Sequence, residues 1–450
     1  MVIYSFLSIL ILIQMGNLID CINSPNPKGL RMKGAHKWLG GAVDSEGKIY
    51  GVPACSNRVL RIDPKTDSIE LLKEEINGKF KWLRGVYIDD EDSIICIPAW
   101  SDHVLRINPK DGSTKEFGYV TLNQKKGWNW HGGQLSPIDN CLYAIPSNAE
   151  QALKIDTKSN KATLIGPKIE GRNKYYGGLL SSKGCIYGIP YRGENVIKIN
   201  PNNQNLPVEL LKHQDITQGF DQTWHGGLTS TNNGKIYGIP SNSNNVLVIN
   251  PDVDTIEMIP VPGERGKYLW GGAAETKDGI IYCIPSDSMD ILKINTHNHQ
   301  VERFGGINDT VYSRSDQGEL IASSHSSLHE YNHNKWQGGV MSGKTGLIIC
   351  IPCHASHILV IDTNTDQLIE IGQDVIKDCG MDKWQGGYLT QDAEGNDVVF
   401  GIPENADYVL RVDCNTLEVK LLGENCSNNN EDFILTVAYQ KVEKEKKEKI

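Results

Sequence analysis

The 450-residue chain has no surplus of basic residues, and beyond its first residues it has no long apolar run. It carries 45 Lys and Arg against 55 Asp and Glu, which gives a net charge of −10. A nucleic-acid partner requires a basic surface, so this balance excludes that class of ligand. No segment has a 3.6-residue apolar period long enough for a core helix, which predicts an all-β protein.

The single apolar run covers residues 6–13 and has the length of the hydrophobic part of a signal peptide. It is too short to span a bilayer unaided. We expect residues 1–22 to be a signal peptide that makes the protein secreted or places it in the secretory pathway. No basic residue precedes the run and no clear cleavage motif follows it, so an uncleaved membrane anchor and a misplaced start codon remain alternatives. In that setting Asn308 and Asn425 are N-glycosylation sequons.

Internal repetition is the strongest positive signal. An aromatic residue before a glycine pair, as in Lys37-Trp-Leu-Gly-Gly41, leads to an apolar run that ends in proline, as in Lys48-Ile-Tyr-Gly-Val-Pro53. Val59-Leu-Arg-Ile-Asp-Pro64 and a fourth apolar run follow. Gly, Asn and Asp-Pro turns separate the runs, which predicts four antiparallel strands per copy. The proline marks eight copies: Pro53, Pro98, Pro146, Pro190, Pro240, Pro285, Pro352 and Pro403.

Eight tandem four-stranded units predict an eight-bladed β-propeller, one domain over residues 35–440. The repeats start near 37, 81, 129, 174, 223, 268, 335 and 383. The alternative is a seven-bladed ring, with the degenerate second copy (Arg84-Gly85) outside it. Residues 433–439 read as one more strand that pairs with the first or last blade, and the tail 441–450 as charged and disordered.

The order of apolar strand, Gly-Lys-Ile-Tyr and Val-Leu-x-Ile-Asp resembles kelch, NHL, SMP-30-type and streptogramin-lyase-type propeller repeats. The resemblance covers nearly the whole mature chain. Kelch repeats place their glycine pair after the Ile-Tyr strand, whereas here the pair precedes it and Pro53 stands in its place. The resemblance therefore implies the architecture and no catalytic residue.

Three cysteines, Cys96, Cys283 and Cys350, share a repeat position that is otherwise Gly or Ala. Such a position is small and buried, so we expect packed thiols, although a secretory protein could form disulfides. Cys350 and Cys353 form the only CxxC, and without a second pair we predict no zinc or redox role for it.

The topology predicts which loops share a face. Connections from the fourth strand to the next first strand emerge with the loops between the second and third strands, on what we call the top face. Those connections vary, and variable loops on a regular scaffold usually carry function. The longest is an insert at 305–335, which we expect on the top face as a lid or partner-binding loop. Its His325, His329 and His333 would share a helix face, but the segment reads better as a hairpin.

Each first strand starts with an aromatic residue: Trp38, Trp82, Trp130, Tyr175, Trp224, Trp336 and Trp384. In the sixth unit we place it one position later, at Trp270. We interpret these rings as packing between blades, with an exposed sugar- or peptide-binding platform as the alternative.

The residue after each aromatic points the opposite way and would face the axial funnel. There we predict ligand contacts from His131, Tyr176, His225, Gln337 and Gln385. Two histidines from separate blades could share a divalent metal, but no third ligand completes a set, so we predict none.

At the top of each second strand, Asn148, Asn242 and Asn405 read as caps of their own turns. Arg192, Asp287 and His354 depart from this pattern, and we predict that they contact the ligand. Arg192 would bind a carboxylate.

The favoured function is a secreted, monomeric binding protein whose top face and funnel take a protein or a glycan. The alternative is a lyase or hydrolase that acts on a small polar substrate in the funnel. No phosphate loop or nucleophile elbow is present, so no catalytic residue is assigned, and no cofactor is predicted.

Overall fold

The computed structural model describes residue 32 and residues 34–121, 127–216, 222–263, 265–305, 311–314, 320–323, 333–423 and 434–435. The expected signal segment, the sequons at Asn308 and Asn425, the residues His325 and His329 and the tail 441–450 lie outside these ranges.

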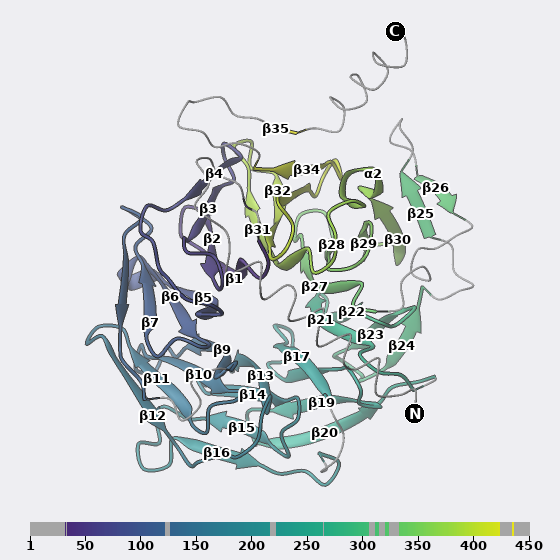
Figure 1. The fold of residues 1–450 in the computed structure, drawn as a ribbon. Coiled ribbons are helices and arrows are strands. Elements are labelled where there is room, and N and C mark those ends of the chain that lie inside the picture. The colour runs from purple at the N-terminus through teal and green to yellow at the C-terminus, as the bar shows by residue number, and fades with distance from the viewer. Residues whose placement is uncertain are drawn as a thin grey trace, which may run out of the picture.

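Eight sheets follow one another along the chain, each built on four antiparallel strands, and stand around a common axis (Figure 1). The predicted eight-bladed propeller is confirmed. The degenerate second copy forms an ordinary blade, so the seven-bladed alternative is wrong. Strands within a blade lie in sequence order, and we name them A to D from the axis outward.

The A strands are β1 (Trp38–Val43), β5 (Trp82–Ile88), β9 (Trp130–Leu135), β13 (Tyr175–Leu180), β17 (Trp224–Thr229), β21 (Trp270–Glu275), β27 (Trp336–Met341) and β31 (Trp384–Gln391). The B strands are β2 (Ile49–Pro53), β6 (Ser93–Pro98), β10 (Leu142–Pro146), β14 (Ile186–Pro190), β18 (Ile236–Pro240), β22 (Ile280–Pro285), β28 (Leu347–Pro352) and β32 (Asp397–Pro403).

The C strands are β3 (Leu60–Asp63), β7 (Val104–Ile107), β11 (Ala152–Asp156), β15 (Val196–Ile199), β19 (Asn245–Asn250), β23 (Ile291–Asn295), β29 (Ile358–Asp362) and β33 (Val409–Asp413). The D strands are β4 (Ser68–Leu71), β8 (Thr114–Phe117), β12 (Lys161–Ile165), β16 (Val208–Leu211), β20 (Thr255–Pro260), β24 (Val301–Phe304), β30 (Gln367–Ile371) and β34 (Val419–Leu422).

The ring closes where β31 of blade 8 meets β1 of blade 1. The A strands of all other neighbouring blades are also in contact. The strand expected over 433–439 is confirmed in its Ile434–Leu435 part, β35, which pairs with β34 at the outer edge of blade 8. A short helix, α2 (Gln373–Ile376), and a 3₁₀ turn (Asp89–Glu91) are the helices within the described ranges. None of the helices described is long and apolar enough to cross a membrane.

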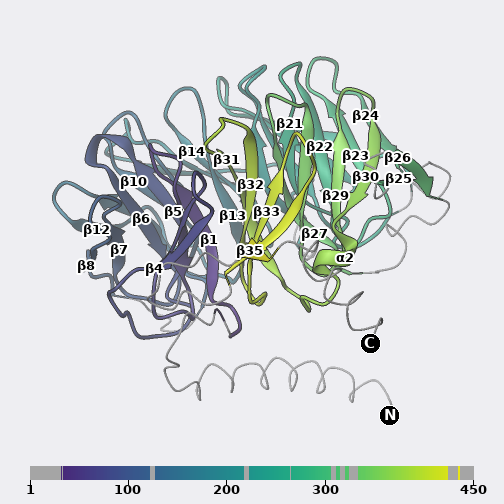
Figure 2. The ribbon, with the colours of Figure 1, turned by 90° about the horizontal axis from the view of Figure 1, so that it is seen from above.

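The insert at 305–335 contributes a hairpin, as the sequence suggested, of β25 (Val311–Arg314) and β26 (Leu320–Ser323). β25 pairs in parallel with β30, the outermost strand of blade 7. The hairpin therefore widens that blade at the periphery and does not cover the funnel (Figure 2).

Each A strand contains a β-bulge, which explains the glycine pair. In blade 5, Trp224 pairs with Pro240 and Gly227 with Gly238, so β17 holds one extra residue. Gly226 takes the left-handed conformation, with φ 74°, which glycine adopts without strain. A Cβ on Gly227 would come within 2.4 Å of the Tyr237 carbonyl oxygen, so the second position also excludes a side chain.

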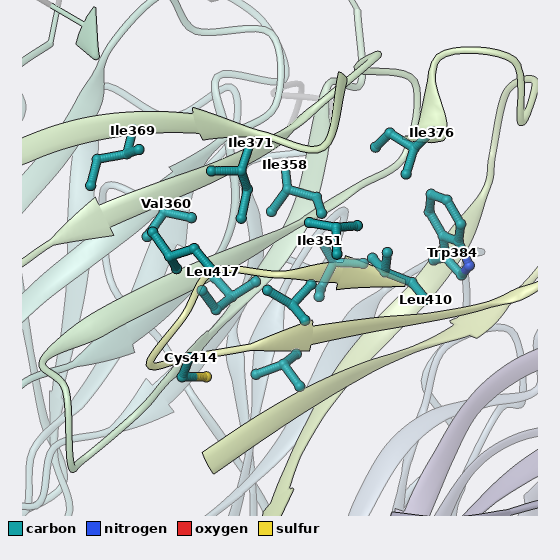
Figure 3. Packing of buried hydrophobic residues seen from close by; sticks show 14 of the residues in the cluster. Ile351, Ile358, Val360, Ile369, Ile371, Ile376, Trp384, Leu410, Cys414 and Leu417 are labelled. Carbon is teal, nitrogen blue, oxygen red and sulfur yellow. The ribbon is translucent and has the colours of Figure 1, made fainter. Parts of the chain in front are cut away.

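The hydrophobic core lies between the blades. Figure 3 shows the cluster between blades 7 and 8, where Ile351 and Ile358 of one blade pack with Trp384 and Leu410 of the next. The aromatic residue that opens each A strand is at most 1% exposed. The indole N–H of Trp224 donates to the Asn245 carbonyl of its own blade at 2.9 Å. The packing interpretation of these rings is confirmed, and the exposed platform is wrong.

The expected shift in the sixth unit is also wrong. Trp270 pairs with Pro285, as Trp224 pairs with Pro240, so it opens its strand in the regular way. The glycine pair is displaced instead, and Gly271 occupies the funnel-facing position of this blade. The three thiols Cys96, Cys283 and Cys350 are fully buried and free, which confirms the expected packing.

Candidate functional site

The top face consists of eight equivalent junctions, at which strand B of one blade ends beside the start of strand A in the next. In blade 4, the Arg192 amide donates to the Asn173 carbonyl at 3.1 Å, and the equivalent bond recurs in all eight blades. Asn173 has a left-handed backbone, with φ 51°, as do its equivalents in six other blades. One backbone geometry therefore presents different side chains at each junction.

Buried lysines tie the blades together at five of these junctions, a role that the sequence reasoning missed although Lys37 precedes Trp38. The Nζ of Lys174 donates to the carbonyls of Ser147 at 2.9 Å and Ala149 at 2.8 Å, both in the preceding blade. Burial lowers the pKa of Lys174 to about 8. The five lysines are at most 4% exposed: Lys37, Lys81, Lys174, Lys335 and Lys383.

The asparagines at the ends of the B strands also connect blades, and the interpretation as caps of their own turns is wrong. Asn148 Oδ1 accepts the Asn173 amide of the next blade at 2.7 Å. Asp287 makes the same contact with the Asn334 amide at 2.5 Å, and its second oxygen lies 3.0 Å from His333 Nδ1. Asp287 thus follows the structural pattern of the junction.

Three predicted ligand-binding residues come together in the funnel wall formed by blades 3 to 5. The His131 and Tyr176 rings stack with centroids 3.9 Å apart, and Tyr176 stacks on Tyr191 at 4.1 Å. The His225 ring meets Tyr176 edge-on at 5.3 Å. We call these four residues the funnel cluster. Tyr191 was missed because only the second residue after each strand-B proline, here Arg192, was considered as a contact, whereas Tyr191 is the first residue after Pro190.

Positive charge acts on the funnel cluster from Arg84. This residue takes the bulge position, with φ 64°, where the other seven blades have glycine. A Cβ on Gly40 would lie 3.2 Å from Arg84 Cγ, which places the arginine against the inner wall. In the sequence, Arg84 was noted only as a degenerate copy of the glycine pair. Strained positions of this kind concentrate at functional sites.

Both funnel imidazoles are held neutral. Burial lowers the pKa of His225 to about 4, with a further contribution from Arg84, and lowers the pKa of His131 well below its usual value. Both rings are enclosed by protein yet retain some accessible surface, as expected for channel-lining residues. Within the described chain, His131 Nδ1 is buried without a hydrogen-bond partner. Buried polar atoms normally have partners, so this nitrogen is one atom of the funnel wall that remains available to accept or donate a hydrogen bond.

Arg192 is exposed at the rim beside this cluster, and its charge opposes the rise that burial causes in the pKa of Tyr176. Gln337 and Gln385 do not join the cluster, because they come from blades 7 and 8 across the ring. Gln337 Nε2 donates to Asn334 Oδ1 at 2.6 Å.

A second set of rings, the rim aromatics Phe80, Trp100 and Trp128, lies over blades 1 to 3. The Phe80 ring lies 4.8 Å from Trp100 and 5.4 Å from Trp128, and all three residues are partly exposed. They pack on Leu39 and Leu83 of the funnel wall. Phe80 has φ 48°, a strained conformation for a bulky residue. The sequence signal for this set was the aromatic residue directly before Lys81 and before Asn129, at a position where the only other large aromatic residue is Tyr268.

His354 belongs to a third group, at the junction of blades 7 and 8. Its Nε2 lies 2.9 Å from Asp382 Oδ1, and the Cys353 thiol donates to the same oxygen at 3.4 Å. The hydrogen bond from His354 lowers the pKa of Asp382. The predicted trio of Arg192, Asp287 and His354 therefore lies in three separate places.

Comparisons with solved structures agree with this fold. Virginiamycin B lyase from Staphylococcus aureus, in its selenomethionine form, is 12% identical with a TM-score of 0.50, covering 70% of this chain and 92% of that chain. A catalytically inactive histidine-to-alanine variant of that lyase with quinupristin gives 12% identity and a TM-score of 0.51, covering 72% and 94%. No family model and no curated protein matches the chain. The resemblance to streptogramin-lyase-type propellers is confirmed as a likeness of fold.

Proposed function

We propose that this protein is a secreted binding propeller whose funnel takes a glycan that carries acidic groups. The observation that carries the proposal is the stacked funnel cluster, together with the positive charge of Arg84, which contributes to the lowered pKa values of His131 and His225. A sugar ring has apolar C–H faces, which pack on aromatic rings, and hydroxyl groups, which hydrogen-bond neutral imidazoles such as His131. An acidic group on the sugar would pair with the guanidinium of Arg84.

The rim aromatics support a ligand longer than one sugar. Phe80, Trp100 and Trp128 continue the ring-lined surface around the top face from the funnel wall. Large, partly exposed rings gathered on one face of a soluble protein mark interaction sites.

The binding experiment measures the affinity of the full chain for acidic and neutral oligosaccharides of equal length by calorimetry. We expect Tyr176→Ala to weaken binding about tenfold, the loss of roughly 1.4 kcal/mol, because it removes the central ring of the stack. Arg84→Gly should weaken the acidic ligand and leave the neutral one unchanged.

Gln385→Ala is the matched control, since it occupies the same strand position across the ring and should bind as the original chain does. Equal loss from Tyr176→Ala and Gln385→Ala would contradict the proposal. Binding of acidic peptides in preference to sugars would overturn the glycan assignment while leaving the funnel as the site.

A lyase or hydrolase is the second candidate, because His131, His225 and Tyr176 converge in one funnel and the similar solved structures include lyases. The lowered pKa of His225 argues against it as a general base, since such bases work best with a pKa near the working pH. Turnover of a bound oligosaccharide that stops in His225→Ala would favour the enzyme.

A further inference from the structure

The eight junctions between blades have equivalent positions, so an unusual set of side chains at one junction can be compared with the other seven. At every junction three residues meet: the two that follow the strand-B proline, and the residue two positions before strand A of the next blade. Between blades 3 and 4 these are Ser147, Asn148 and Asn173, and the other junctions vary, with alanine at Ala54 and Ala99. Between blades 7 and 8 they are Cys353, His354 and Asp382, three side chains that each offer a metal-ligand atom.

The geometry of this junction suits a small divalent cation. The Cys353 Sγ, the His354 imidazole nitrogen and an Asp382 carboxylate oxygen all lie within 4.8 Å of one another. Zn–N bonds of about 2.0 Å and Zn–S bonds of about 2.3 Å place tetrahedral ligands roughly 3.3–3.7 Å apart. The Nε2–Oδ1 distance of 2.9 Å and the Sγ–Oδ1 distance of 3.4 Å require shifts of only a few tenths of an ångström.

We infer that Cys353, His354 and Asp382 form a zinc site that bridges blades 7 and 8. Sulfur and nitrogen ligands select zinc over magnesium or calcium, which prefer oxygen. Three protein ligands leave the fourth tetrahedral position open to water or to a ligand on the top face.

The surroundings position these ligands from both blades. Asn334 Nδ2 donates to Cys353 Sγ at 3.3 Å, and Lys383 Nζ donates to the Cys353 carbonyl at 2.9 Å, which fixes the thiol and its backbone. Cys353 is 1% exposed, whereas the Asp382 side chain is 41% exposed. A metal would therefore reach the shielded thiol past the carboxylate.

This site differs from both metal positions considered in the sequence. Cys350 of the CxxC pair packs in the core between blades 6 and 7, and Cys353 meets Asp382 of blade 8 instead. The site also lies apart from His131 and His225, which belong to blades 3 and 5. It does not depend on the glycan proposal.

The test uses the full chain, stripped with a chelator and titrated with Co²⁺ alone and then Zn²⁺ alone. We expect one equivalent of Co²⁺ to bind with a thiolate-to-cobalt charge-transfer band and a tetrahedral d–d spectrum, and Zn²⁺ to raise the melting temperature. Cys353→Ser should remove the charge-transfer band, and His354→Ala and Asp382→Asn should each weaken Zn²⁺ binding at least about tenfold.

Cys55→Ser is the control, because Cys55 holds the His354 position in blade 1 and is also partly exposed, and this variant should bind Zn²⁺ normally. Absence of the band in the original chain, or its survival in Cys353→Ser, would overturn the inference. If Cys353→Ser fails to fold, the test rests on Asp382→Asn, which changes the exposed ligand. Unchanged Zn²⁺ affinity in that variant would also overturn the inferred zinc site.

Discussion

Trp224 and His225 are neighbours in the sequence, yet they belong to two different parts of the molecule. The first position of strand A is Trp or Tyr in all eight blades and is at most 1% exposed. The second position changes from blade to blade: Leu39, Leu83, His131, Tyr176, His225, Gly271, Gln337 and Gln385. Uniformity among copies marks packing between blades, whereas the second position varies because its surroundings in the funnel wall differ from blade to blade.

The largest effect should come from the uniform position. Trp224→Ala removes a buried ring and its hydrogen bond to Asn245, and we expect a loss of about 3–5 kcal/mol in the free energy of unfolding. Trp128→Ala, which truncates a partly exposed rim aromatic, should cost much less. Chemical denaturation of both variants measures the difference, and equal losses would erase the distinction between scaffold and surface.

A smaller effect should come from the lysines that tie neighbouring blades. Lys174→Met removes the ammonium donor of the Ala149 carbonyl and one of two donors of the Ser147 carbonyl, and we expect a loss of about 1–3 kcal/mol. Lys158→Met, at an exposed turn of blade 3, should have no measurable effect in the same denaturation experiment. A neutral Lys174→Met would show that the cost of burying the ammonium group cancels its hydrogen bonds.

The smallest effect, and one of opposite sign, should come from the bulge. Arg84→Gly relieves a left-handed conformation, and we expect a gain of about 1 kcal/mol in stability. Gly226→Ala introduces the same strain where a Cβ would meet nothing within 4 Å, so it should lose a similar amount. Thermal melting of the pair checks both signs, and a destabilised Arg84→Gly would mean that the arginine stabilises the funnel.

The repeat made the fold predictable. Proline, the glycine pair and Asp-Pro turns fix where each strand starts and stops, and strand alternation correctly placed His131, Tyr176 and His225 on one surface. The β-bulge could not be predicted from the sequence, because its extra left-handed residue is signalled only by a glycine, and glycine is common in turns as well. Taking the glycines as the fixed point of the repeat therefore misplaced Trp270.

Contacts across blades were beyond the sequence. Tyr191 meets the His225 ring edge-on, and Asp382 reaches Cys353, through the angle between adjacent sheets rather than through spacing along the chain. The sequence shows that Arg84 replaces the first glycine of the pair, but only the structure shows that its side chain lies against the inner wall of the ring.

Every blade is built from one continuous stretch of chain, and this gives the ring a seam. In the described part of the chain, blades 8 and 1 share no sheet and meet through side-chain contacts, such as Arg411 with Asp67 at 2.8 Å, and through the backbone hydrogen bond from the Lys37 amide to the Glu404 carbonyl at 3.0 Å. Separating blade 8 from blade 1 would therefore break no pairing between strands, and all eight sheets would stay intact. A circular permutant, with the present termini joined and new termini in an underside turn, would move this seam from the junction of blades 8 and 1 into the blade that is cut.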